Sequence, residues 1–148
     1  MTDEKSIFDR ARKRGSENKL PYAGALLPAE AHEVLQGNSK AKLVDVRTQA
    51  ELDWVGRIPG AETIEWNSWP EGRRNENFVE QLKALVPPGE TPLMFICRSG
   101  ARSHNAAIAA TDAGYSNCLN VLEGFEGNKD ENGQRNKIGG WRAAGLPW

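Results

Sequence analysis

The sequence predicts an α/β protein built in three layers, a parallel β-sheet with helices on both of its faces. Short apolar runs typical of buried strands alternate with segments of helical periodicity, and this alternation is typical of parallel sheets. The chain has 148 residues, which suits one domain with a sizeable core. No internal repeat or low-complexity tract breaks the alternation.

An extension outside this domain is expected over residues 1–27. Residues 1–14 are predicted to form a short, solvated helix that ends at Gly15, and a tether then runs through Pro21. Acidic residues interrupt the basic ones here and no apolar run is present, so neither a transit peptide nor a secretory signal is expected. The domain itself is expected over residues 28–148.

The first half of the domain is predicted to contain a helix over residues 28–37, a strand over 42–46, a helix that begins after Thr48, and a strand over 62–65. Proline is favoured at the first position of a helix, where Pro28 stands, and Gly37 then ends that helix. The residues from Thr48 to Glu51 match a capping box, in which two side chains bond the backbone at the start of a helix. We therefore expect Glu51 to cap a helix rather than to act in catalysis.

The second half is predicted to contain a helix over residues 77–85, a strand over 92–97, a helix over 105–113, and a strand over 117–122. Apolar side chains at helical spacing, followed by two prolines, indicate the first of these helices. The helix over residues 105–113 is rich in alanine and is followed by Gly114, a typical helix end. Cys118 lies in the last strand, where we expect buried packing rather than a second reactive thiol.

Cys97 stands at the end of an apolar strand, and a loop of small and cationic residues follows it. The carboxyl ends of strands are the usual ligand positions in open α/β sheets. Backbone N–H groups of such a loop and the amino end of the next helix stabilise an anion, and nearby arginines favour a thiolate. A buried cysteine that only packs would not explain two arginines in the turn beside it. The predicted site therefore consists of the nucleophile Cys97 with the loop residues Arg98, Ser99, Gly100, Ala101, Arg102 and Ser103.

Asp45 and Arg47 are supporting candidates, because they stand at the end of the first strand of the domain, which shares a sheet edge with the end of the Cys97 strand. Asp45 could bond the active loop or pair with an arginine, or it could only shape a turn. Arg47 could reach the pocket or balance a nearby carboxylate. His104 follows the loop, and an exposed histidine near a helix start is the more common outcome for such a residue.

Three blocks of this sequence resemble the rhodanese family of sulfurtransferases, and they occur in the family's order. They are Leu43-Val44-Asp45-Val46-Arg47 with Glu51 and Gly56-Arg57-Ile58-Pro59-Gly60-Ala61; the Cys97 loop; and Gly124-Phe125-Glu126-Gly127 with Gly140-Trp141 and Ala144-Gly145-Leu146-Pro147. The resemblance extends from about residue 28 to residue 148. Arg57 departs from it, since many members carry a histidine there, and a polar insert over residues 128–138 divides the last block.

The resemblance implies a rhodanese-like fold and sulfur transfer through a Cys97 persulfide. The donor would be a small anion such as thiosulfate or a persulfide, and the acceptor a thiol or cyanide. The acceptor protein, if there is one, is not indicated. No cofactor is implied. A persulfide carrier or redox-regulatory module, which holds a persulfide without turnover, remains an alternative.

A cysteine-dependent phosphatase is the other alternative. The rhodanese-like phosphatases have a C-x5-R loop, with an arginine six positions after the cysteine. Here the sixth position is Ser103, and Arg102 stands at the fifth. The phosphate cradle is thus one residue short, which favours sulfur transfer.

Composition excludes several other classes of protein. The net charge is −1 and no apolar run approaches the length of a membrane span, so neither a nucleic acid nor a membrane is an expected partner. Two cysteines and two distant histidines do not predict a disulfide framework or a metal site. A reducing compartment, the cytoplasm, is the expected location.

The insert over residues 128–138 is predicted to be a surface loop, because it is polar and lacks apolar periodicity. It follows the last strand, whose carboxyl end shares a sheet edge with Cys97. It would therefore border the mouth of the pocket and help to choose the sulfur acceptor, or it is a tolerated decoration, since loop insertions cost little free energy.

Overall fold

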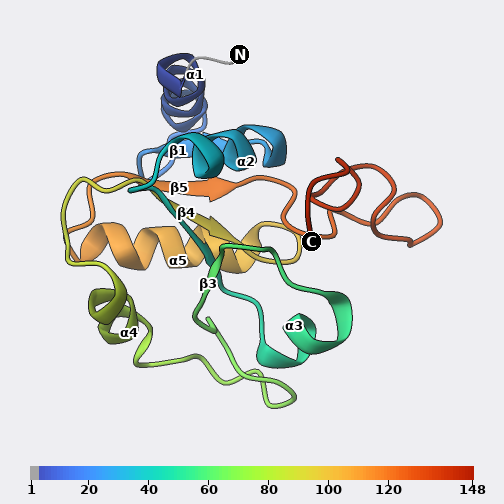
Figure 1. Ribbon diagram of the computed structural model, residues 1–148. Helices are drawn as coiled ribbons and strands as arrows, with labels where there is room; N and C mark the ends of the chain where they lie inside the picture. The colour runs from blue at the N-terminus through green and yellow to red at the C-terminus, as the bar shows by residue number, and fades with distance from the viewer. Residues whose placement is uncertain (1–3) are drawn as a thin grey trace.

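The computed structural model describes residues 4–148 and contains a five-stranded sheet with helices on both faces (Figure 1). The strands are β1 (Gly24–Leu26), β2 (Lys42–Asp45), β3 (Glu62–Thr63), β4 (Leu93–Ile96) and β5 (Cys118–Val121). Their order across the sheet is β1-β5-β4-β2-β3, and every pairing is parallel. The predicted three-layer α/β class is confirmed. The carboxyl end of β4, which precedes Cys97, lies in the middle of the sheet.

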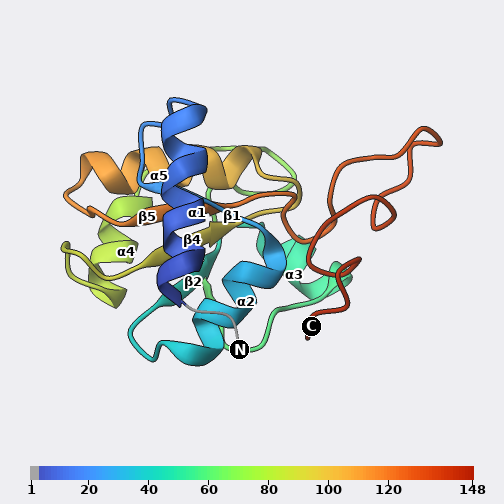
Figure 2. The same cartoon turned by 90° about the horizontal axis from the view of Figure 1, so that it is seen from above.

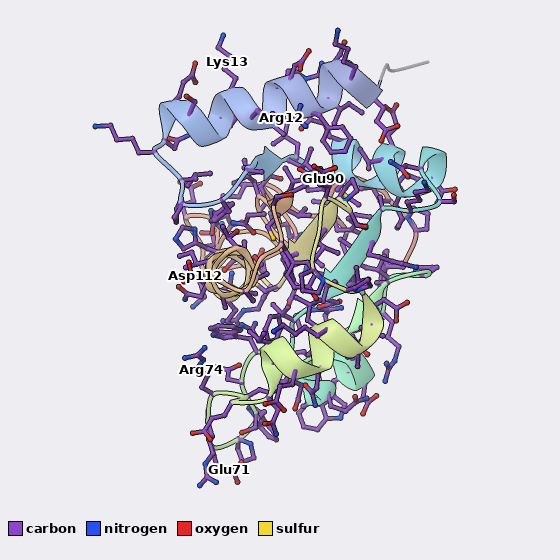
Figure 3. All side chains as sticks on the ribbon, turned by 90° about the vertical axis from the view of Figure 1, so that its left-hand side faces the viewer. Arg12, Lys13, Glu71, Arg74, Glu90 and Asp112 are labelled. Atoms are coloured by element: carbon purple, nitrogen blue, oxygen red, sulfur yellow. The ribbon has the colours of Figure 1, made fainter. Side chains whose placement is uncertain are left out.

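Alternate residues of the strands pack against different helices. In β4, Met94 and Ile96 belong to one apolar cluster and Leu93 and Phe95 to the other. The first cluster is covered by α1 (Glu4–Glu17) and α2 (Pro28–Gly37), and the second by α4 (Phe78–Leu85) and α5 (Ala101–Asp112). Figure 3 shows α1 on one side of the sheet and α4 on the other. Because side chains alternate along a strand, a shift of one residue would move each of them to the wrong face, which fixes the register.

The first helix differs from the solvated helix that the sequence predicted. Ile7, Phe8 and Ala11 are buried against the domain, while Lys13 points away from it (Figure 3). Gly15 lies inside the helix rather than ending it, and a Cβ there would approach the Ala23 carbonyl oxygen to 2.9 Å. Glycine is therefore needed for close packing rather than as a stop. Residues 1–3 of the predicted helix lie outside the described residues.

Residues 24–26, which the sequence predicts to lie in the extension and tether, form the edge strand β1. It pairs in parallel with β5 and packs under α1, which crosses above the sheet in Figure 2. Three residues are too few to show strand periodicity, and for this reason the sequence did not reveal the strand.

The other predicted elements are confirmed, with ends that shift by one to a few residues. The capping box of α3 (Gln49–Val55) forms as expected, with Thr48 accepting from the Glu51 N–H group. The main correction concerns α5. It begins at Ala101 rather than at residue 105, so Arg102 and Ser103 stand in its first turn instead of in a loop.

The insert over residues 128–138 contains no helix or strand and is mostly exposed, which confirms a surface loop. It projects beyond α3 in Figures 1 and 2. Its base is closed tightly, because a Cβ on Gly127 would lie 2.1 Å from the Gly139 carbonyl oxygen. Among residues 4–148, no helix has both the length and the apolar character that crossing a bilayer requires.

Candidate active site around Cys97

Cys97 follows β4 directly and is 1% exposed. The Gly100 N–H group donates to its Sγ at 3.1 Å. Gly100 has a φ of 118°, a left-handed conformation that favours glycine, and it immediately precedes α5. The sulfur therefore lies at the amino end of a helix of 12 residues, where the helix dipole stabilises a negative charge.

Ser103 brings a second polar group to the sulfur. Its Oγ lies 3.3 Å from the Cys97 Sγ and 2.6 Å from the Asn120 Oδ1. Ser103 was among the predicted site residues, whereas Asn120 was not. The only signal for Asn120 was a polar residue within an apolar strand, a pattern that usually marks a structural hydrogen bond.

The segment that follows β5 forms hydrogen bonds with the backbone of the Cys97 loop. The Phe125 N–H group donates to the Cys97 carbonyl at 2.8 Å, and the Glu126 N–H group to the Arg98 carbonyl at 3.0 Å. A Cβ on Gly124 would lie 2.6 Å from both of these carbonyl oxygens, so only glycine permits this approach. The third block of the sequence thus holds the backbone of the Cys97 loop.

The two loop arginines differ in their surroundings. Arg98 is exposed and has no ion-pair partner among the described residues. Arg102 is largely buried and donates both terminal nitrogens to the Glu51 carboxylate, at 2.6 and 3.0 Å. The two arginines line a pocket of about 300 Å³ together with Glu51, Thr48 and Trp69. A small anion in this pocket would meet one free cation and one neutralised cation.

Glu51 therefore has two roles, since it caps α3 and also pairs with Arg102. Burial alone would raise the pKa of Glu51, but the hydrogen bonds and charge of Arg102 and the capping bonds from Thr48 lower it from 4.5 to about 2. Burial alone would lower the pKa of Arg102. The hydrogen bonds and charge of Glu51 outweigh this effect and raise the pKa, with further contributions from Cys97 and Asp45. The sequence predicted the cap because it is local, and missed the ion pair because it joins two distant elements.

The depressed pKa of Glu51 predicts a loss of stability in acid. A group whose pKa is lower when folded stabilises the protein above its unfolded value, and this stability is lost as pH falls from about 4.5 to about 2. We expect the free energy of unfolding to fall across this window by about 2–3 kcal/mol more in the parent protein than in Glu51→Gln. Urea unfolding at several pH values measures this, and parallel curves for the two proteins would contradict it.

Asp45 and Arg47 form a buried ion pair below the site and do not line this pocket. Both residues are 0% exposed, and the Arg47 guanidinium donates to both Asp45 oxygens at 2.7–3.1 Å. The guanidinium also bonds the Gly56 carbonyl and lies 4.0 Å from the centre of the Phe125 ring. Of the roles that the sequence left open for these two residues, the structure supports pairing: Asp45 pairs with an arginine, and Arg47 balances a nearby carboxylate. The pair supports Phe125, which in turn bonds the Cys97 carbonyl.

The second cysteine and the histidine take separate places. Cys118 is fully buried in β5, and this burial raises the pKa of its thiol to about 11, as expected for packing. His104 is half-buried rather than exposed, and its Nδ1 lies 2.6 Å from the Tyr22 hydroxyl. That hydroxyl comes from the segment before β1, so the amino-terminal part of the chain contacts the first turns of α5.

Comparison with known proteins agrees with this arrangement. A sequence model described as "Rhodanese-like domain" matches residues 27–131. An uncharacterized protein of Rickettsia prowazekii is 37% identical over 120 residues, which is 80% of this chain and 91% of that protein. Thiosulfate sulfurtransferase 18 of Arabidopsis thaliana is 35% identical over 101 residues, 66% of this chain and 71% of that protein.

A solved structure, that of Rv0390 from M. tuberculosis, superposes with a TM-score of 0.78. It is 44% identical and the match covers 86% of this chain and 97% of that one. The chain belongs to the family of rhodanese-like domains and has sulfurtransferases among its relatives.

Proposed function

We propose that the protein is a sulfurtransferase that moves a sulfane sulfur from an anionic donor such as thiosulfate to a thiol or cyanide through a persulfide on Cys97. The observation that carries this proposal is the position of Sγ, which takes a hydrogen bond from the Gly100 N–H group at the amino end of α5. A pocket lined by Arg98 and Arg102, the first and fifth residues after Cys97, suits a small anion. Both cysteines are free thiols, which fits a reducing compartment such as the cytoplasm.

In the first step, the Cys97 thiolate attacks the outer sulfur of thiosulfate. A bond forms between the two sulfurs, the S–S bond of the donor breaks, and sulfite leaves with the bonding electron pair. The thiol proton released beforehand ends on sulfite or on solvent. Negative charge on the sulfur is stabilised by the Gly100 N–H group and the helix dipole.

In the second step, the acceptor attacks the outer sulfur of the persulfide. With cyanide, a carbon–sulfur bond forms, the S–S bond breaks, and thiocyanate leaves while the Cys97 thiolate is restored. The reaction is thus covalent catalysis with two half-reactions. The same groups at the helix end would stabilise Cys97 when it departs as the leaving group.

Steady-state kinetics with thiosulfate and cyanide test this proposal. We expect many equivalents of thiocyanate per protein, with the pattern of two half-reactions. Release of a single equivalent followed by no further product would identify a persulfide carrier instead. A small aryl phosphate assayed in parallel should be hydrolysed negligibly, and hydrolysis that depends on Cys97 and is faster than sulfur transfer would overturn the proposal.

Arg98 is expected to bind the anionic donor, because its guanidinium is exposed at the pocket and unpaired within the described part of the chain. Arg98→Gln should raise KM for thiosulfate roughly fivefold, the equivalent of about 1 kcal/mol, and leave kcat nearly unchanged. The difference should shrink at high salt. Arg12→Gln is the control, because it removes the same charge from α1, which contributes no residue to the pocket (Figure 3). An equal KM for the two variants would place Arg98 outside the donor site.

A further inference from the structure

The Ser103 hydroxyl stands between three groups but has a single proton to donate. Its Oγ lies 2.6 Å from the Asn120 Oδ1, 3.2 Å from the Gly100 carbonyl oxygen and 3.3 Å from the Cys97 Sγ. The Asn120 Oδ1 and the Gly100 carbonyl oxygen can only accept a hydrogen bond. The contact with Asn120 is the shortest of the three, so the Ser103 hydroxyl donates its proton to the Asn120 Oδ1.

The Gly100 carbonyl fixes which way the Asn120 amide faces. The Asn120 Nδ2 lies 3.3 Å from that carbonyl oxygen and donates to it. The opposite orientation would place the amide oxygen against the carbonyl oxygen, and two buried acceptors facing each other without a proton are unfavourable. The amide oxygen therefore faces Ser103, and Ser103 directs its proton away from the sulfur.

We propose that Asn120 is a positioning residue that acts through Ser103, whose oxygen opposes ionisation of Cys97 and offsets part of the stabilisation that the Gly100 N–H group gives the thiolate. With its proton bonded to Asn120, the Ser103 oxygen presents a lone pair to the sulfur. A thiol can donate to that lone pair, whereas a thiolate would be repelled by it. This inference rests on the proposed function and adds a regulating contact to the same site. A thiol that ionises less readily is attacked more slowly by alkylating and oxidising reagents.

Asn120 is well placed for this role because it belongs to a central strand and is 5% exposed. Its other side faces a cavity of about 550 Å³, whose wall also includes Tyr22 and His104. Burial raises the pKa of Tyr22, and a hydrogen bond from Asn120 offsets part of that rise. The amide is thus bounded by a phenol, a carbonyl and a hydroxyl.

Charged groups from several elements surround the sulfur, and the positive ones favour the Cys97 thiolate whereas the negative ones disfavour it. They are Arg98 on the loop, Arg102 and His104 on α5, Glu51 on α3, Asp45 at the end of β2 and Arg47 after it, and Arg14 and Glu123 at the cavity beyond Asn120. Arg102 is paired with Glu51, and Arg47 with Asp45. A substitution of Asn120 by a neutral residue changes none of these charges, so its effect reports the hydrogen bonds of Asn120 with Ser103 and Gly100.

The test is a pH titration of the thiolate by its ultraviolet absorbance in a Cys118→Ala background, with Cys97→Ser as the blank. We expect Asn120→Leu to lower the titration midpoint by about 0.5–1 pH unit, the size of one ordinary hydrogen bond. Ser103→Ala should also lower it, because the acceptor for the thiol proton is gone. Adding Asn120→Leu to Ser103→Ala should produce no further shift. Asn105→Leu, an exposed position on α5, is the control.

A midpoint for Asn120→Leu that equals or exceeds that of the parent would overturn the proposal, as would a further shift in the double variant. If Asn120→Leu does not fold, Ser103→Ala decides alone. A higher midpoint there would mean that Ser103 donates to the thiolate, and a lower one that it accepts from the thiol. The titration needs no sulfur donor, so it stands even if thiosulfate fails to load Cys97, which would refute the proposed function separately.

Discussion

Cys97→Ser is expected to remove thiosulfate-to-cyanide sulfur transfer while leaving the fold unchanged. A serine hydroxyl is not ionised at neutral pH and cannot form a persulfide, so the loss should be at least about a thousandfold. The substitution changes little in volume, and the new hydroxyl can keep the hydrogen bonds with Gly100 and Ser103. Steady-state thiocyanate formation measures the activity, and circular dichroism checks the fold.

Cys118→Ser is the matched control for this prediction. Cys118 is a fully buried thiol on the neighbouring strand β5, and its raised pKa makes it a poor nucleophile. We expect this variant to retain its sulfur transfer, although the buried hydroxyl costs some stability. Activity that survives Cys97→Ser and disappears in Cys118→Ser would reverse the assignment of the nucleophile.

Arg47→Met is expected to lower the free energy of unfolding by about 3–5 kcal/mol, because it leaves the Asp45 carboxylate buried without its counter-charge. Methionine keeps most of the apolar volume that packs against Phe125. Adding Asp45→Asn removes the unpaired charge, so the double variant should recover part of this loss. Urea unfolding gives the free energies.

Arg57→Met is the control for the buried pair. Arg57 forms an ion pair with Asp53 on α3, but both side chains are about half exposed. Exposed pairs contribute roughly 0–1 kcal/mol, so this substitution should have little effect on unfolding. If Arg47→Met costs no more than Arg57→Met, the Asp45–Arg47 pair does not hold the support beneath the Cys97 loop.

The sequence predicted best what depends on neighbouring residues. Proline and glycine at the ends of α2 and the capping box of α3 act over a few positions, and each forms as expected. The strand, loop and helix around Cys97 were visible for the same reason. The sequence predicts the start of α5 too late, because the small and cationic residues after Cys97 have the composition of a loop. In the structure the left-handed turn at Gly100 lets the helix begin at Ala101.

Contacts between distant segments could not be predicted in the same way. Asn120 and Ser103 are 17 positions apart, and Arg102 and Glu51 are 51 apart. Nothing local marks such partners, because either side chain could equally well face solvent. The high charge of α1 concealed its buried side, and only its packing on β1 shows that Ile7 and Phe8 belong to the core.

The proposed reaction requires that a sulfur atom resides on Cys97 between its two half-reactions. Incubating the protein with thiosulfate, removing the donor, and locating the added mass by intact-protein and peptide mass spectrometry tests it most directly. We expect one additional sulfur atom on the peptide that contains Cys97, and we expect it to be lost when cyanide is added. An unmodified protein, or an added sulfur on Cys118, would contradict it.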